Sequence, residues 1–373
     1  MRGVCFFGGY IENYPRSAVL RKGLEKLGVP VSSCRVHHKK RLPARYAALI
    51  AAYLRSNRDF SVIYVPEFRH KDVPLAWLIG KLSGKKVVFD PLVSRYDTKV
   101  HDRGDAPERS VQAWHNRNLD RLSLALPDLV LADTQAHADY YISELGASPA
   151  KVRILPVGVD EELFKPKAAG QGMESNDGHR RAATKVLFFG NYLPLHGVPT
   201  IVRAANLLRA RQDIEFELLG GGQTFPEVEA LVLREQADNI HLLPRIPIES
   251  LPDKISSATF CLGIFGQTDK ASRVVPNKVY QCMAMAKAVI TARSPAMLER
   301  FADDDSLCLV PPGDAQALAD KIVHLADHAE ERERIAARAH QLVHEQYSSE
   351  KIAGLLLTYL HEDSRAAGRS GDR

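Results

Sequence analysis

A stretch in the second half of the chain, "VVPNKVYQCMAMAKAVI" (residues 274–290), combines residue types that suit an anion. Pro276 and Asn277 stand where a helix would begin, and we expect Asn277 to be its N-cap because its side chain can accept a backbone N–H. The N–H groups and the dipole of a helix N-terminus favour negative charge, and Lys278 would add a positive charge. The stretch therefore predicts an anion site at the start of this helix.

Glycines follow two of the apolar runs that are typical of buried strands. Gly8 and Gly9 follow "GVCFF", and Gly222 ends "IEFELLGGG". Because glycine lacks a Cβ atom, its backbone can approach a ligand closely. We therefore expect these glycines at a binding site, with a tight strand-to-helix turn and no ligand as the alternative.

Apolar runs alternate with helical patterns along the whole chain, in two successive series. This alternation predicts an α/β protein with two facing Rossmann-like domains, each with a parallel sheet covered on both sides. We expect an N-terminal domain at 1–166, a linker at 165–185 and a C-terminal domain at 184–347. A helix at 348–362 is expected to pack back on the first domain. Ligands of such sheets bind beyond the carboxyl ends of the strands, so the cleft between the domains is the expected active site.

The composition limits the possible partners. A net charge of +5 is too small to indicate nucleic acid, although it is compatible with a phosphate-bearing ligand. The five cysteines form no C-x-x-C pair, which favours buried, reduced thiols in a cytoplasmic protein. We find no apolar run long enough to span a membrane and no signal peptide at the N-terminus, so we expect a location inside the cell.

Several longer stretches, taken in order, resemble a known family. They include "KVLFFGNYLPLHGVPTIVRAANLL", "FELLGGGQ", "PNKVYQCMAMAKAVITARSPAMLE", "CLVPPGDAQALADKIVHLA" and, in the first half, "PDLVLADTQAHADYYISELGASPAKVRILPVGVDEELFKP". The chain resembles the retaining nucleotide-sugar glycosyltransferases of GT-B architecture, specifically glycosyltransferase family 4 (group 1). The resemblance covers most of the chain and implies a nucleotide-diphosphate sugar as the donor substrate.

The resemblance also implies where the donor binds. The family usually has two acids separated by seven residues, but Arg273 and Gln281 stand at these positions. An Arg and a Lys that often bind the diphosphate are replaced by Asn191 and His196. We expect Arg273 and Lys278 to be the positive partners of the diphosphate and Gln281 to bind a ribose hydroxyl group. The expected donor-site residues are Gly8, Gly9, Gly190, Asn191, His196, Gly222, Arg245, Ile246, Val275, Asn277 and Gln281.

Asp90 is the best candidate for a catalytic group in the first domain. It ends the run "KKVVFD", where the family often has a histidine, and it could orient an acceptor hydroxyl group or the sugar. Capping of the next helix, or pairing with an arginine, is an equally good interpretation. We expect Asp90, Arg273 and Lys278 to be the catalytic residues.

The resemblance implies transfer with retention, without a protein nucleophile, a cofactor or a metal ion. The acidic run Asp303–Asp305 could be a metal site, but we interpret it as a solvated turn. The expected acceptor is a glycan, a lipid-linked sugar or a small molecule. Alternatives are a non-catalytic protein that binds nucleotide sugars, suggested by Arg273 and Gln281, and a sugar-nucleotide epimerase of the same architecture. A nucleotide-dependent oxidoreductase is disfavoured because no glycine run spells G-x-G-x-x-G.

Residues 35–58 are basic and lack any acid. Within them, apolar residues recur at helical spacing: Tyr46, Leu49, Ile50, Tyr53 and Leu54. We favour packing of this apolar face on the sheet, with the charges solvated. The alternative is peripheral contact between the basic edge and an anionic membrane at its inner face.

Overall fold

The computed structural model describes residues 2–166 and 183–370, and of residues 363–370 the backbone alone. The chain divides into two compact units. The first comprises the residues up to Asp160 together with those from Tyr347 onward, and the second runs from Glu161 to Gln346. Most of the predicted linker at 165–185 lies outside the described residues. Because the N-terminal part of the first unit ends at Asp160, it is a few residues shorter than the domain 1–166 that the sequence suggested.

The first unit is a six-stranded parallel sheet with the strand order β2-β1-β3-β4-β5-β6. Its strands are β1 (Val4–Gly8), β2 (Val31–Arg35), β3 (Val62–Val65), β4 (Lys86–Phe89), β5 (Leu129–Ala132) and β6 (Val152–Ile154). Its longer helices are α1 (Pro15–Lys26), α2 (Leu42–Arg55), α3 (Val73–Ser83), α4 (Val111–Ala125), α5 (Gln135–Ser143) and α14 (Ser349–Ser370).

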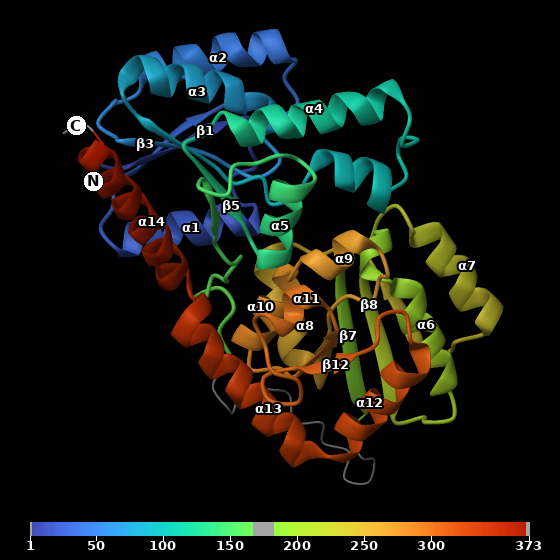
Figure 1. The fold of residues 1–373 in the computed structure, drawn as a ribbon. Coiled ribbons are helices and arrows are strands. Elements are labelled where there is room, and N and C mark those ends of the chain that lie inside the picture. The colour runs from blue at the N-terminus through green and yellow to red at the C-terminus, as the bar shows by residue number, and fades with distance from the viewer. Residues whose placement is uncertain (1, 167–182, 371–373) are drawn as a thin grey trace. The chain divides into compact units, whose positions relative to one another are not determined.

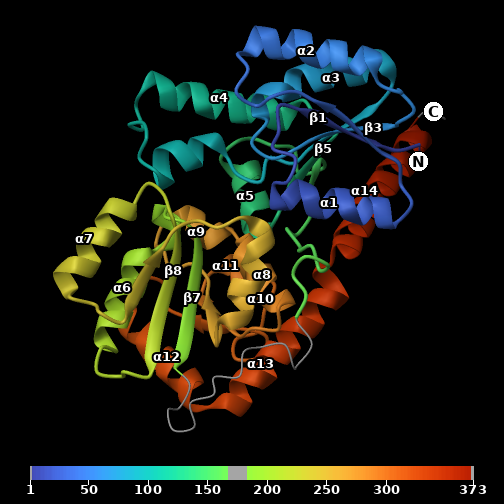
Figure 2. The ribbon, with the colours of Figure 1, turned by 180° about the vertical axis from the view of Figure 1, so that it is seen from behind.

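Helices cover both faces of this sheet. Figures 1 and 2 show α2, α3 and α4 on one side and α1 with α14 on the other. This follows from the strand order, because the connection from β1 to β2 runs in the opposite direction to the later ones and right-handed crossovers then fall on opposite faces. Strands β1, β3 and β5 are buried along their whole length, as continuous apolar runs in parallel sheets predict.

The second unit repeats this architecture with the strand order β12-β11-β10-β7-β8-β9, again all parallel. Its strands are β7 (Thr184–Asn191), β8 (Ile214–Gly221), β9 (Ile240–Leu243), β10 (Phe260–Leu262), β11 (Val289–Ala292) and β12 (Cys308–Val310). Its helices are α6 (Val198–Leu207), α7 (Phe225–Glu235), α8 (Leu251–Ser257), α9 (Asp269–Arg273), α10 (Asn277–Ala284), α11 (Pro295–Leu298), α12 (Ala315–Asp327) and α13 (Ala329–Leu342).

The prediction of two Rossmann-like domains with parallel sheets is confirmed. All five cysteines are buried and free, as expected from their spacing. The last helix begins at Ser349 and continues to Ser370, beyond the predicted end at 362. Within the described ranges, no helix is both long and apolar enough to cross a membrane.

The last helix packs against the first, although more than 300 residues separate them along the chain (Figure 1). The two helices approach closely at Gly23, where a Cβ atom would lie 1.9 Å from the backbone oxygen of Ser349. A glycine is needed there because backbone cannot move aside as a flexible side chain can. Gly354 on the same last helix has nothing within 4 Å of a Cβ position.

We predict that Gly23→Ala lowers the free energy of unfolding by about 1–3 kcal/mol, because the methyl group would overpack the contact between α1 and α14. The matched change Gly354→Ala should leave stability unchanged or raise it by up to about 1 kcal/mol, since alanine is the better helix former. Denaturant unfolding of both variants checks this. Equal stability of the two would contradict the close approach at Gly23.

Candidate functional site

Three of the residues predicted from the sequence meet at the end of β7. Gly190 has a φ of +139°, a backbone conformation that favours glycine. A Cβ atom there would lie 3.2 Å from Lys278 Nζ and 3.6 Å from His196 Cε1. Lys278 comes from the first turn of α10 and His196 from a short 3₁₀ turn, Pro194–His196. The fold therefore brings two basic side chains to the carboxyl end of one strand.

Lys278 is buried without a polar partner. Its side chain is 5% exposed, and no described residue accepts a hydrogen bond from its Nζ atom. Nζ lies 3.7 Å from the centre of the Phe188 ring, a contact that favours the charged amine by about 1–2 kcal/mol. Burial costs an isolated charge several kcal/mol, so it outweighs the ring contact. Burial thus lowers the pKa of Lys278 well below its usual value.

His196 is buried beside this lysine and is neutral. Its Nδ1–H donates to the backbone oxygen of Asn191, which leaves Nε2 with a lone pair. Burial and the nearby charge of Lys278 lower the pKa of His196, and Lys270 on α9 lowers it further. Lys270 is itself buried. The sequence analysis did not select it, and its position three residues before Arg273 is the only signal that could have indicated it. The side chain of Asn191 is exposed.

The prediction that Asn277 caps α10 is wrong. The N-cap is Pro276, in an extended conformation and without a side-chain cap, and Asn277 is the first helical residue. A proline is favourable near a helix start because it fixes φ and has no N–H to satisfy. Val275 and Gln281 are buried on either side of this start, and Arg273 is the half-buried last residue of α9.

A second group of predicted residues lies at the ends of the two neighbouring strands. A Cβ atom at Gly222, whose φ is +156°, would lie 2.7 Å from the backbone oxygen of Tyr192. Arg245, beyond the end of β9, donates from Nη2 to the backbone oxygen of Gly221 at 2.5 Å, and half-buried Ile246 follows it. Since β7, β8 and β9 are adjacent and parallel, these residues lie along one edge of the sheet.

In the first unit, the glycine loop after β1 is bound by side chains of the same unit. Gly9 N–H donates to Asp72 Oδ2 at 2.9 Å, and Arg69 Nη1 donates to the Gly9 oxygen at 2.6 Å. Asp72 also pairs with Arg45 at 2.8 Å. A Cβ atom at Gly8 would lie 3.0 Å from Asp72 Oδ2. The close approach expected at these glycines is therefore made by Asp72, and their contact with a ligand stays a prediction.

Asp90 lies in a fully buried ion pair. Its Oδ2 atom accepts from Arg16 Nε and from the Tyr64 hydroxyl group, both at 2.7 Å. Arg16 also donates from Nη1 to the backbone oxygen of Pro156 at 2.5 Å. Of the structural roles that the sequence suggested for Asp90, pairing with an arginine is therefore the one that the structure shows. Direct action of Asp90 on a substrate stays a prediction.

A second buried acid follows β3. Glu67 accepts a hydrogen bond of 2.5 Å from the hydroxyl group of Ser17, which lies one residue after Arg16 on α1. Burial raises the pKa of Glu67 to about 7. Neither Arg16 nor Ser17 could be found from the sequence, because "YPRSAVL" resembles any amphipathic helix start.

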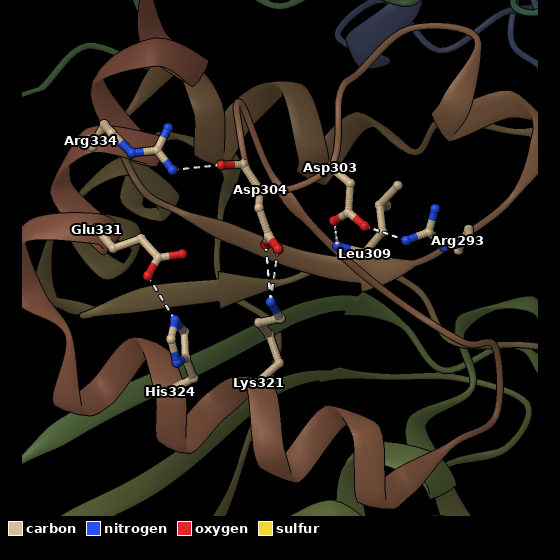
Figure 3. A network of polar contacts seen from close by, with 8 residues as sticks. All are labelled: Arg293, Asp303, Asp304, Leu309, Lys321, His324, Glu331 and Arg334. Atoms are coloured by element: carbon tan, nitrogen blue, oxygen red, sulfur yellow. Dashed lines mark hydrogen bonds and ion pairs between the residues drawn. The ribbon is translucent and has the colours of Figure 1, made fainter.

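The acidic run at 303–305 lies at a turn, as expected, and the side chains of Asp304 and Asp305 are 46% and 47% exposed. Its three acids are also ion-paired, which the sequence did not indicate. Figure 3 shows Asp303 paired with Arg293 and accepting from Leu309 N at 2.7 Å. Asp304 contacts Lys321 Nζ at 3.1 Å, and its backbone oxygen accepts from Arg334 at 2.6 Å. In the part of the chain that the structure describes, no three His, Cys, Asp or Glu side chains are placed to bind a metal ion.

Two family models match the chain in succession. The model described as Glycosyl transferase 4-like domain matches residues 5–158, and that described as Glycosyl transferases group 1 matches residues 183–328. Each match falls within one of the two units, so the family and the fold divide the chain at the same place.

The chain is also similar to individual proteins. It is 27% identical to the D-inositol 3-phosphate glycosyltransferase of Segniliparus rotundus, over 89% of this chain and 73% of that protein. It is 22% identical to the MMP alpha-(1->4)-mannosyltransferase of Mycolicibacterium hassiacum, over 62% of this chain but only 53%, about half, of that protein. The structure of Anabaena HepE with UDP and glucose aligns with a TM-score of 0.72 at 14% identity, covering 97% of this chain and 100% of that one.

We predict that Lys278→Met stabilises the ligand-free protein by about 1–2 kcal/mol, because methionine fills the space without a buried amine. The gain should decrease as the pH rises towards about 10.5, where lysine in the unfolded chain also becomes neutral.

Lys287→Met is the matched control. Lys287 Nζ donates to the backbone oxygens of Ser256 and Ala258 at 2.9 and 2.6 Å, so its loss leaves two acceptors without that donor and should destabilise the protein. Denaturant unfolding at pH 7 and pH 10 distinguishes the two variants. Destabilisation by both would contradict the account of Lys278.

Proposed function

Because this chain belongs to the group 1 glycosyltransferases and has their GT-B architecture, we propose that it transfers a sugar from a nucleotide diphosphate to an acceptor hydroxyl group. The observation that supports this most directly is the buried, unpartnered amine of Lys278 beside Gly190 and His196. A diphosphate would provide the negative charge that this amine lacks in the unit itself.

Lys278 is the residue that we assign to the diphosphate. The helix start at α10 adds backbone N–H groups that have no acceptor within the helix. Lys270 adds a second positive charge near His196. Together these groups stabilise the charge that develops on the diphosphate as it leaves the sugar.

The transfer step requires no nucleophile from the protein. The acceptor oxygen forms a bond to the anomeric carbon, and the bond from that carbon to the diphosphate oxygen breaks. The proton of the acceptor hydroxyl group passes to the leaving diphosphate on the same face of the sugar, which gives retention. Positive charge near the diphosphate and correct placement of the acceptor account for the rate. We further propose that the step needs no metal ion.

Arg245 and Gly222 lie at the same edge of the second sheet, where we place the nucleotide-sugar donor. Their contacts at the ends of β8 and β9 support binding of the nucleoside through backbone groups. HepE was solved with UDP and glucose, which makes UDP the first nucleotide to test. We assign acceptor binding to the first unit, and the acceptor to a glycan, a lipid-linked sugar or a small hydroxylated molecule. A location inside the cell stays a prediction.

One observation favours a second function. Arg273 and Gln281 occupy the positions where the family resemblance implies acids, and Gln281 is buried within the first two turns of α10. An amide binds a hydroxyl group less strongly than a carboxylate does. A protein that binds nucleotide sugars without transferring them is therefore the alternative.

We predict that UDP or another nucleoside diphosphate raises the melting temperature of the wild-type protein without added metal, because a ligand that binds only the folded state stabilises it. At a concentration one hundred times its dissociation constant, the gain is about 2.7 kcal/mol. The shift should be lost in Lys278→Met and retained in Lys287→Met.

Incubation of the same proteins with radiolabelled nucleotide sugars distinguishes the two functions. Sugar transfer or slow hydrolysis of the donor by the wild-type protein supports the enzyme, whereas binding without either reaction supports the alternative. An equal nucleotide shift in wild-type protein and Lys278→Met would contradict a donor site at Lys278.

A further inference from the structure

Apolar side chains are exposed mainly on one set of helices in the first unit. Eight of the thirteen exposed large apolar side chains among the described residues lie on α2, α3 and α4: Leu42, Ile50, Leu54, Leu78, Leu82, Val111, Trp114 and Leu122. These three helices lie on the same side of the first sheet (Figures 1 and 2). Single exposed apolar residues are ordinary, but a concentration on one face marks an interaction surface.

The helix α2 shows why these residues are not part of the core. Leu49 and Tyr53 are buried against the sheet, but Ile50 and Leu54 are 43% and 60% exposed. The expectation that the whole apolar face of residues 35–58 packs on the sheet is therefore wrong in part. The outward stripe of α2 consists of Pro43, Ala47, Ile50 and Leu54 at helical spacing, and it is entirely apolar.

The other two helices continue this pattern. On α3, Leu78 and Leu82 lie one turn apart, and Leu82 is 80% exposed. On α4, Val111 and Trp114 are 82% and 67% exposed. An exposed indole ring on a helix surface is costly in water but suits the boundary between lipid headgroups and acyl chains.

The exposed charged side chains of these three helices have one sign. No exposed residue of α2, α3 or α4, all fully described, is acidic, and the one acid in these helices, Asp120, is buried. Exposed basic side chains accompany the apolar ones: Arg55 on α2, Lys81 on α3 and Arg121 on α4. Of these, Lys81 also contacts Asp128, which follows α4, at 3.5 Å. By contrast, α7 and α12 in the second unit carry exposed acids such as Glu229 and Asp320.

We propose that the outward face of α2, α3 and α4 docks the protein on the surface of an anionic lipid bilayer. Apolar side chains would enter the headgroup region while lysine and arginine side chains contact lipid phosphates, each adding about 1 kcal/mol. The absence of exposed acids on these helices favours an anionic bilayer over a second copy of the chain, whose identical basic face would repel it. The inference rests on exposed side chains and is independent of the transfer reaction.

The direct test is co-sedimentation of the full chain with vesicles of phosphatidylcholine alone or with about a third phosphatidylglycerol. We expect binding only to the anionic vesicles, weakening as salt rises, since screening reduces the attraction. The chain has two tryptophans, Trp77 and Trp114. In Trp77→Phe, the emission of Trp114 should shift to the blue when anionic vesicles are added.

Leu82→Ser and Leu233→Ser form a matched pair, because Leu233 is 74% exposed but lies on α7 of the second unit. Leu82→Ser should weaken vesicle binding about tenfold, whereas Leu233→Ser should leave it unchanged. Both are surface substitutions, and unchanged melting temperatures would show that both fold. Absence of vesicle binding at low salt would overturn the proposal, as would equal losses in the two variants. A dimer that Leu82→Ser dissociates, without lipid binding, would instead identify a second copy as the partner.

Discussion

The second unit is organised around a buried lysine that has no polar partner among the described residues. The fold places Lys278 Nζ over the ring of Phe188 and beside Gly190, where burial opposes its charge. An arrangement of this kind costs stability, and such a cost is typical of sites where a ligand provides the missing charge. The basic neighbours of Lys278, the glycines and the start of α10 all have a consistent explanation if that ligand is a diphosphate.

Close backbone packing makes this position possible. A Cβ atom at Gly220 would lie 1.9 Å from the backbone oxygen of Gly190, so the end of β8 can approach β7 only because residue 220 is glycine. With Gly190 lacking a side chain, the lysine and His196 reach the end of β7. The placement of Lys278 and His196 at the end of β7 therefore depends on Gly190 and Gly220 as well as on the basic residues themselves.

The architecture could be predicted from the sequence because it depends on local patterns. Apolar runs separated by helical patterns predict the strands and helices and their order. The strand ends then indicate the edge of the sheet where ligands of such folds usually bind. The structure brings Gly190, His196 and Lys278 together, and their role in binding a donor stays a prediction. Phe188 was missed because an aromatic residue in a strand normally belongs to the core.

The remaining features depend on contacts between distant residues. Asp90 pairs with Arg16, 74 residues away, and no spacing in the sequence indicates such a pair. The acidic run at 303–305 likewise meets Lys321 and Arg334 from two later helices. For α2, periodicity identified the apolar residues, but only the structure shows that Leu49 faces the sheet while Ile50 faces outward.

The most direct test of this account is the pKa of Lys278, measured by NMR of protein with labelled lysine side chains, with and without UDP. Lys278→Met identifies the resonance. We expect a pKa well below 10.5 without the nucleotide and a marked rise when UDP binds, because the diphosphate stabilises the charged amine. An ordinary pKa that UDP leaves unchanged would contradict the claim that Lys278 is the buried anion-binding group of the second unit.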